Sequence, residues 1–111
     1  MCNFKSWHFD DNGYVIECME CSYLRVCFSS TLLTLNKEDY SAFYDLVCWK
    51  KESHISMHDE NTKCIVLATP CKSVQIILTE KELNDLYHML QQADTEIRTQ
   101  QLLDLFSAEN S

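Results

Sequence analysis

The sequence predicts an α+β fold in which an antiparallel sheet is covered on one face by two helices. The main observation is a near-repetition: Leu33–Val47 is echoed by Ile76–Leu90 at a constant offset of 43 residues. In both copies an apolar strand meets a capping residue (Asn36 or Thr79), an acidic first turn and an amphipathic helix. A repeated strand-then-helix unit constrains the architecture more strongly than any single propensity. An N-terminal hairpin signal and short β-branched runs complete the prediction.

The length of 111 residues fits one domain with a sizeable core. We therefore expect a single α+β domain over residues 1–111, built from two pseudo-repeated ββα units and an N-terminal hairpin. Its expected parts are the hairpin over 4–18, the first ββα unit over about 21–51, the second over about 63–94 and a C-terminal tail helix over about 95–106.

The hairpin is predicted by Asn12-Gly13, which lies between two apolar-rich runs and forms the strongest short-range turn signal. Centring the turn on this pair fixes a register, because side chains alternate between the faces of a strand. The expected pairs are Phe9 opposite Ile16 and Trp7 opposite Cys18 on one face, with His8 and Glu17 on the other.

Four further strands are expected at the apolar, β-branched runs Tyr23–Phe28, Leu32–Leu35, Cys64–Thr69 and Val74–Leu78. Ser53–Asn61 is ambiguous and includes a possible short strand through Ile55 and Met57. Because β-sheet edges are usually paired or covered, open edges and the apolar tail make a homodimer an expectation.

The first helix is expected to begin after Asn36, an effective N-cap, and to end near Lys50-Lys51. Thr79 and Glu82 form a capping box at the start of the second helix. The tail either continues this helix or breaks near Ala93-Asp94.

Charge and composition exclude several functions. The net charge of −8 is spread over both halves, and no cluster of basic residues offers a phosphate-binding surface, so we expect no nucleic-acid binding. With one glycine, neither a Walker loop nor a dinucleotide fingerprint is possible. The sequence contains no apolar run of membrane-spanning length and no signal-peptide pattern, so a cytoplasmic protein without membrane contact is expected.

Seven cysteines are many for this length, and their odd number prevents complete intrachain pairing. A reducing compartment makes disulfides the less expected use. We expect Cys27, Cys48 and Cys64 to be small buried hydrophobic residues, because free cysteine is among the most buried residue types.

Cys18-Met-Glu-Cys21 has the spacing of half a zinc knuckle. The hairpin is expected to bring Cys2 towards Cys21 as a third ligand. His8 is a suitable residue type for the fourth ligand, although the expected register points its side chain away from Cys18. Other candidates for the fourth position are Cys27, Cys64 and Cys71. Ser22 stands where knuckles carry glycine, and a second Cys-x-x-Cys is absent.

Three other readings remain open. The same motif suits a thiol-redox protein, but its acidic, inter-strand setting lacks the positive environment that lowers a thiol pKa. His54 and His58 share one face in either a strand or a helix and are a weaker metal-ligand pair. Aromatic residues form a possible ligand box, although helical spacing favours a core role: Tyr40, Tyr44, Tyr87 and Trp49.

The chain resembles a family of short uncharacterised bacterial proteins known chiefly from Bacteroidota. The resemblance is carried by Asn12–Cys21, Val26–Thr31, Leu35–Tyr40, Ile77–Leu83 and Ala93-Asp94. It implies a small cytosolic protein without assigned activity, so it assigns no functional residues.

The expected function is a non-enzymatic binding or adaptor module with a protein partner or self-association. A structural zinc site at Cys2, Cys18, Cys21 and His8 is the associated metal hypothesis. The alternatives are a small thiol-redox protein or enzyme using Cys18 and Cys21, and an acidic regulatory subunit of a larger complex. No catalytic residues are predicted.

Overall fold

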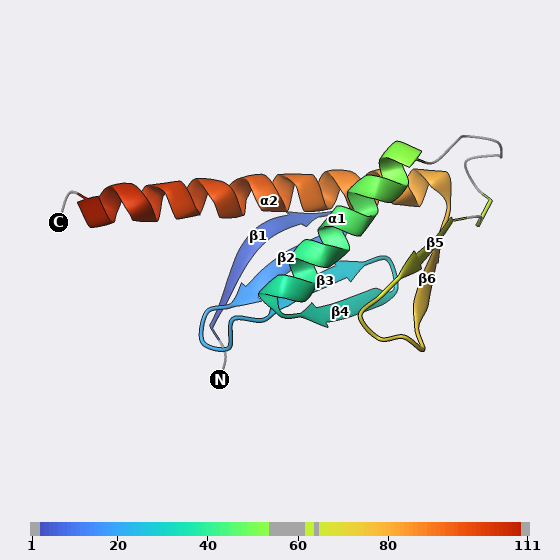
Figure 1. The fold of residues 1–111 in the computed structure, drawn as a ribbon, viewed down its shortest axis with the longest axis horizontal. Helices are drawn as coiled ribbons and strands as arrows, with labels where there is room; N and C mark the ends of the chain where they lie inside the picture. Colours follow the sequence, from blue (N-terminus) through green and yellow to red (C-terminus); the bar gives the residue numbers. More distant parts are fainter. Residues whose placement is uncertain (1–2, 54–61, 64, 110–111) are drawn as a thin grey trace.

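The fold, seen in a computed structural model that describes residues 3–53, 62–63 and 65–109, is of the α+β class (Figure 1). Its elements in chain order are β1 (Phe4–Asp10), β2 (Gly13–Cys18), β3 (Leu24–Phe28), β4 (Thr31–Leu35), α1 (Lys37–Ser53), β5 (Ile65–Ala68), β6 (Gln75–Leu78) and α2 (Glu80–Glu109). The expected strands and helices are therefore confirmed, apart from the possible strand in Ser53–Asn61, of which residues 54–61 lie outside the described residues.

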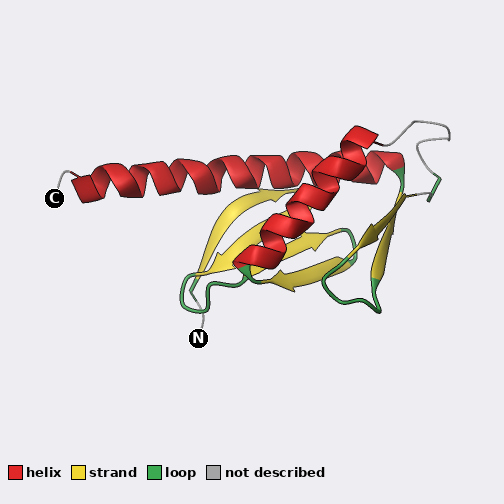
Figure 2. Ribbon diagram, viewed as in Figure 1, coloured by secondary structure: helices red, strands yellow, loops and turns green. Residues whose placement is uncertain are grey.

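The strands do not form one sheet as expected. β1 to β4 form an antiparallel sheet in sequential order, whereas β5 and β6 pair only with each other in a separate hairpin. Figure 2 shows this hairpin at one end of the four-stranded sheet. Ile65, Leu67 and Leu78 of the hairpin belong to the same buried cluster as the sheet and both helices, so it closes one end of the core.

The predicted register of the first hairpin is wrong. Phe4 pairs with Cys18 and Phe9 with Tyr14, so the turn residues are Asp11 and Asn12 rather than Asn12 and Gly13. An irregularity between Ser6 and His8 shifts the register further. As a result Trp7 and Glu17, expected on opposite faces, lie on the same side, and the Trp7 indole Nε1–H donates a 3.0 Å hydrogen bond to Glu17.

Two local interactions explain where this turn falls. The Asp10 carboxylate accepts hydrogen bonds from the backbone N–H groups of Asn12 at 2.7 Å and Gly13 at 3.2 Å, as an Asx turn does. Gly13 is then the first residue of β2, where a Cβ atom would lie only 1.8 Å from the carbonyl oxygen of Cys27. Glycine is needed here for close strand approach and not for the turn.

Both predicted helix caps are confirmed. The Asn36 side chain accepts a hydrogen bond from the Asp39 N–H at 2.7 Å. Thr79 and Glu82 form the reciprocal capping box, with distances of 2.9 and 3.0 Å, and Lys63 also donates to the Glu82 carboxylate. The two helices begin 43 residues apart, as the near-repetition predicts, but equivalence of the two ββα units stays a prediction because their strands pair differently.

The tail continues the second helix, which makes α2 a single 30-residue helix. Its first half packs on the core through residues spaced three or four apart: Leu83, Leu86, Met89, Leu90 and Ala93. Residues 101–107 are all exposed, and Figure 1 shows this end projecting beyond the sheet. Despite the length of α2, no helix in the described part is long and apolar enough to cross a membrane. The homodimer stays a prediction.

Candidate functional site

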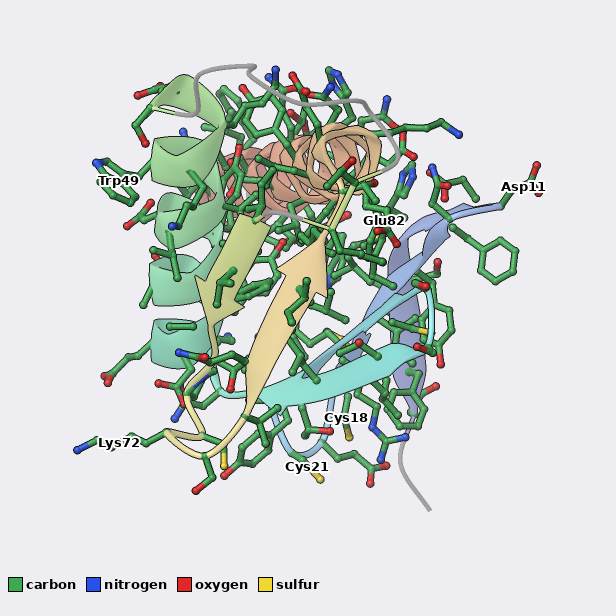
Figure 3. The ribbon with its side chains drawn as sticks, turned by 90° about the vertical axis from the view of Figure 1, so that its right-hand side faces the viewer. Asp11, Cys18, Cys21, Trp49, Lys72 and Glu82 are labelled. Atoms are coloured by element: carbon green, nitrogen blue, oxygen red, sulfur yellow. The ribbon has the colours of Figure 1, made fainter. Side chains whose placement is uncertain are left out.

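A cleft of about 550 Å³ lies between α1, α2 and the β1–β2 side of the sheet; we call it the α1–α2 cleft. The two helices are close where α1 ends and α2 begins, and they diverge towards the start of α1, as Figures 1 and 3 both show. This volume is within the range of small-molecule and cofactor sites. The cleft therefore arises from the divergence of two packed helices over a sheet.

The floor of the α1–α2 cleft contains a buried carboxylate. Glu17 on β2 lines the cleft, and its side chain is only 10% exposed. One oxygen accepts the hydrogen bond from Trp7, and the other is 3.8 Å from the Lys37 ammonium nitrogen. Because the register shift at Trp7 brings the indole beside Glu17, the local irregularity of β1 creates this pair.

Tyr40 of α1 contributes a second buried polar group to the cleft. The residue is 6% exposed, and its hydroxyl has no hydrogen-bond partner among the described residues. Burial raises the pKa of Tyr40, and the nearby charges of Asp94 and Tyr44 act in the same direction. Burial also raises the pKa of Tyr44 to about 12. Both phenols are therefore neutral at physiological pH.

The wall formed by α2 is polar where the helix leaves the core. The Asp94 carboxylate forms an ion pair with Arg98, one helical turn later, and its oxygen lies 2.9 Å from the Arg98 Nε. Gln100 accepts a 3.4 Å hydrogen bond from the Lys5 ammonium, which also lies 4.9 Å from the centre of the Trp7 ring. Among the described residues, the lining includes neither histidine nor cysteine. The cleft thus offers aromatic faces and charges of both signs.

The Cys18–Cys21 motif lies elsewhere, in the turn from β2 to β3. Cys18 is buried and Cys21 exposed, and the Cys21 N–H donates to the Cys18 sulfur at 3.3 Å. Ser22 has a positive φ of 64°, so it adopts the left-handed conformation usually assigned to glycine. Figure 3 shows both cysteine side chains at the same end of the sheet. The turn has knuckle-like backbone geometry without the glycine.

The structure does not bring His8 to these cysteines. His8 pairs with Val15, whereas Cys18 pairs with Phe4, which is four residues or roughly 13 Å further along β1. The His8 ring instead contacts the Asp10 carboxylate at 2.6 Å.

Other predicted metal-site residues are also apart or outside the description. Cys2, Cys64, His54 and His58 lie outside the described residues. Cys27 pairs with Tyr14, near the other end of β2. Cys71 is exposed in the β5–β6 loop, which Figure 1 places at the opposite end of the sheet from the β2–β3 turn. Within the described part of the chain, no three histidine, cysteine or acidic side chains gather as a metal site.

The expected roles of several residues need correction. Cys27 and Cys48 are only half-buried, and among the five described cysteines the buried one is Cys18. Trp49, expected in the core, is 58% exposed and points away from α1 in Figure 3. Glu17 was not predicted as a site residue, because the expected register placed it on the other face of the hairpin from the Trp7 indole.

The fold and the cleft define a small α+β protein made of a four-stranded sheet, a β-hairpin and two helices, with a ligand-sized cleft between the helices and the sheet. The chain belongs to a family of unknown function, DUF6686, whose model matches residues 1–109. No curated protein and no solved structure matches the chain. The family match accords with the resemblance inferred from the sequence, while the bacterial group stays a prediction.

Proposed function

We propose that this protein is a non-enzymatic binding module whose binding site is the α1–α2 cleft. The Tyr40 hydroxyl is the observation that carries the proposal. A buried hydroxyl without a hydrogen bond costs free energy in the folded protein, so its retention in a cleft favours a role in contacting a ligand.

Ligand titration followed by NMR tests this proposal directly. The protein has two tryptophans, of which Trp7 lies in the cleft floor and Trp49 on the exposed surface. A fragment set spanning cationic, anionic and neutral aromatic compounds is expected to include members that shift the Trp7 indole N–H resonance saturably and leave Trp49 unchanged. Ser41→Phe, which fills the cleft from an exposed position, should abolish these shifts. A fragment set that never moves Trp7 selectively would contradict the proposal.

We also propose a structural zinc ion at the β2–β3 turn, bound by Cys18, Cys21 and Cys2. The Cys21 N–H···S contact supports it, because hydrogen bonds to sulfur favour the thiolate that binds metal. The Met19 N–H donates to the Asn3 carbonyl at 2.8 Å, which places the residue after Cys2 beside the turn. His8 is the ligand least supported by the geometry, so the fourth position of this closed site is left to another residue.

Metal analysis of protein purified without a polyhistidine tag tests the zinc proposal. We expect about one equivalent of zinc, because a structural site holds one ion. Cys18→Ser should lose the metal, and Cys71→Ser, in the distant β5–β6 loop, should retain it. Less than about 0.2 equivalents in the wild-type protein would contradict the site.

A further inference from the structure

The charged groups of the α1–α2 cleft are arranged by depth. Carboxylates and basic groups both line it: Glu17, Asp45, Asp94 and Asp104 against Lys5, Lys37 and Arg98. The side chains of Glu17 and Asp94 are 10% and 23% exposed, whereas their partners Lys37 and Arg98 are 69% and 74% exposed. The Glu17 carboxylate is therefore the most buried charged group of the cleft, whereas Asp45 and Asp104 are exposed and lie with Lys37 and Arg98 on the rim.

The inner carboxylate keeps capacity for a further contact. Among the described residues, the Glu17 carboxylate receives one side-chain hydrogen bond, from Trp7, and its second oxygen is 3.8 Å from the Lys37 nitrogen, beyond hydrogen-bond distance. Ion pairs with such exposed partners contribute little to stability. A cation that enters the cleft can therefore replace Lys37 beside Glu17 without disturbing the fold.

The protein already places one ammonium group on an aromatic face in this cleft. The Lys5 nitrogen lies 4.9 Å from the centre of the Trp7 ring, within the distance of a cation–π interaction. Lys5 thus shows that this face of the indole suits a cation, and it is also a competitor for the same position.

Tyr40 supplies an independent indication of a polar ligand. Its hydroxyl is buried beside cleft residues and lacks a hydrogen-bond partner within the described residues, so it can accept from an N–H group once a ligand displaces the side chains that cover it. The net charge of −8 attracts cations towards the protein over a longer range.

From this arrangement we propose that the α1–α2 cleft binds an ammonium or guanidinium group, with Glu17 as its counter-ion and Trp7 and Tyr40 as its aromatic and hydroxyl contacts. This inference rests on the proposed function of the cleft. The cation belongs either to a free diamine or to a lysine or arginine side chain of a protein partner. The second source agrees with an acidic regulatory subunit that meets a basic protein.

Titration of the two indole resonances with matched probes tests the inference. The cationic probes are 1,4-diaminobutane, Nα-acetyl-lysine amide and Nα-acetyl-arginine amide, and the controls are 1-butanol and butyrate. We expect saturable, Trp7-selective shifts with at least one cationic probe and none with the controls. Binding of the diamine alone identifies a free amine as the source, and binding of a capped amino acid identifies a protein side chain.

Two variants are expected to change cation affinity in opposite directions, and a third serves as a control. Glu17→Gln keeps an acceptor for Trp7 and should weaken cation binding at least tenfold, while Lys5→Met removes the internal competitor and should strengthen it. Asp11→Asn removes one negative charge at the hairpin tip, away from the cleft, and should leave affinity within about twofold (Figure 3). Equal shifts by cations and controls would overturn the inference while leaving the cleft as a binding site. Failure of every probe and fragment would contradict both proposals.

Discussion

Replacing Gly13 by alanine is expected to lower the free energy of unfolding by about 3 kcal/mol, as overpacking against backbone does. The added Cβ would lie 1.8 Å from the Cys27 carbonyl oxygen, so β2 and β3 must separate. The oxygen belongs to the sheet backbone and the position of a Cβ is fixed by the backbone, so no side-chain rotation can relieve the contact. Urea denaturation followed by circular dichroism measures the loss.

Asn12→Ala is the matched control, because Asn12 is exposed and occupies the turn beside Gly13. Its cost should stay within about 0.5 kcal/mol, as for surface substitutions in general. If Asn12→Ala were the more damaging change, the turn would be centred on Asn12-Gly13 and the observed register would be incorrect.

Leu90→Ala is expected to lower the free energy of unfolding by about 3 kcal/mol, through lost burial and a residual cavity. Leu90 is fully buried where α2 packs against the rest of the core. Leu102→Ala is the same chemical change in the projecting part of α2, at a side chain that is 57% exposed. It should alter stability by less than about 0.5 kcal/mol.

The comparison of these two leucines tests the division of α2 into a packed and a projecting segment. Thermal and urea denaturation of both variants give the two free-energy changes. Comparable losses at Leu90 and Leu102 would mean that the C-terminal end of α2 is packed on the protein in solution, which contradicts the structure.

Local patterns predicted the elements of this fold well. Asn36 and the Thr79–Glu82 box fixed both helix starts, because caps depend on a few adjacent residues. The pairing of strands was harder, since Ile65–Ala68 and Gln75–Leu78 read equally well as members of the main sheet or as a separate hairpin. Periodicity identifies a buried face but not the sheet to which it belongs.

The register error shows a different limit of sequence reasoning. Asn-Gly is a strong turn signal, yet the Asp10 side chain moved the turn by one residue, because it accepts two backbone hydrogen bonds. Moving the turn by one residue shifts every cross-strand partner by two residues, so it leaves the faces unchanged, whereas the one-residue irregularity between Ser6 and His8 reverses which side chains share a face. The irregularity at Trp7 therefore hid the pairing of Trp7 with Glu17.

The cleft could not be predicted for a related reason. Tyr40 and Tyr44 follow helical spacing, and this spacing indicated a core face. Tyr40 is indeed buried, but its hydroxyl lies beneath a cleft that exists only because α1 and α2 diverge. Helix divergence depends on tertiary packing and leaves no signal in either helix alone.

A pH signature accompanies the burial of Tyr40. Its pKa is raised above the ordinary value of 10.0, so the folded protein holds this proton more tightly than the unfolded chain. The resulting stabilisation is complete below pH 10 and is lost as the pH rises towards the folded pKa. As the pH rises above 10, the free energy of unfolding should therefore fall less for Tyr40→Phe than for the wild type. Part of the fall that remains in the variant comes from Tyr44, whose pKa is also raised.

The free energy of unfolding of Tyr40→Phe at neutral pH, measured by urea denaturation beside the wild type, tests the central claim that the cleft is built for binding. If the hydroxyl awaits a ligand, its removal should leave stability unchanged or raise it by about 1 kcal/mol, because an unsatisfied buried polar group is removed. A loss of more than about 1 kcal/mol would show that the hydroxyl serves the fold itself, and would contradict the account.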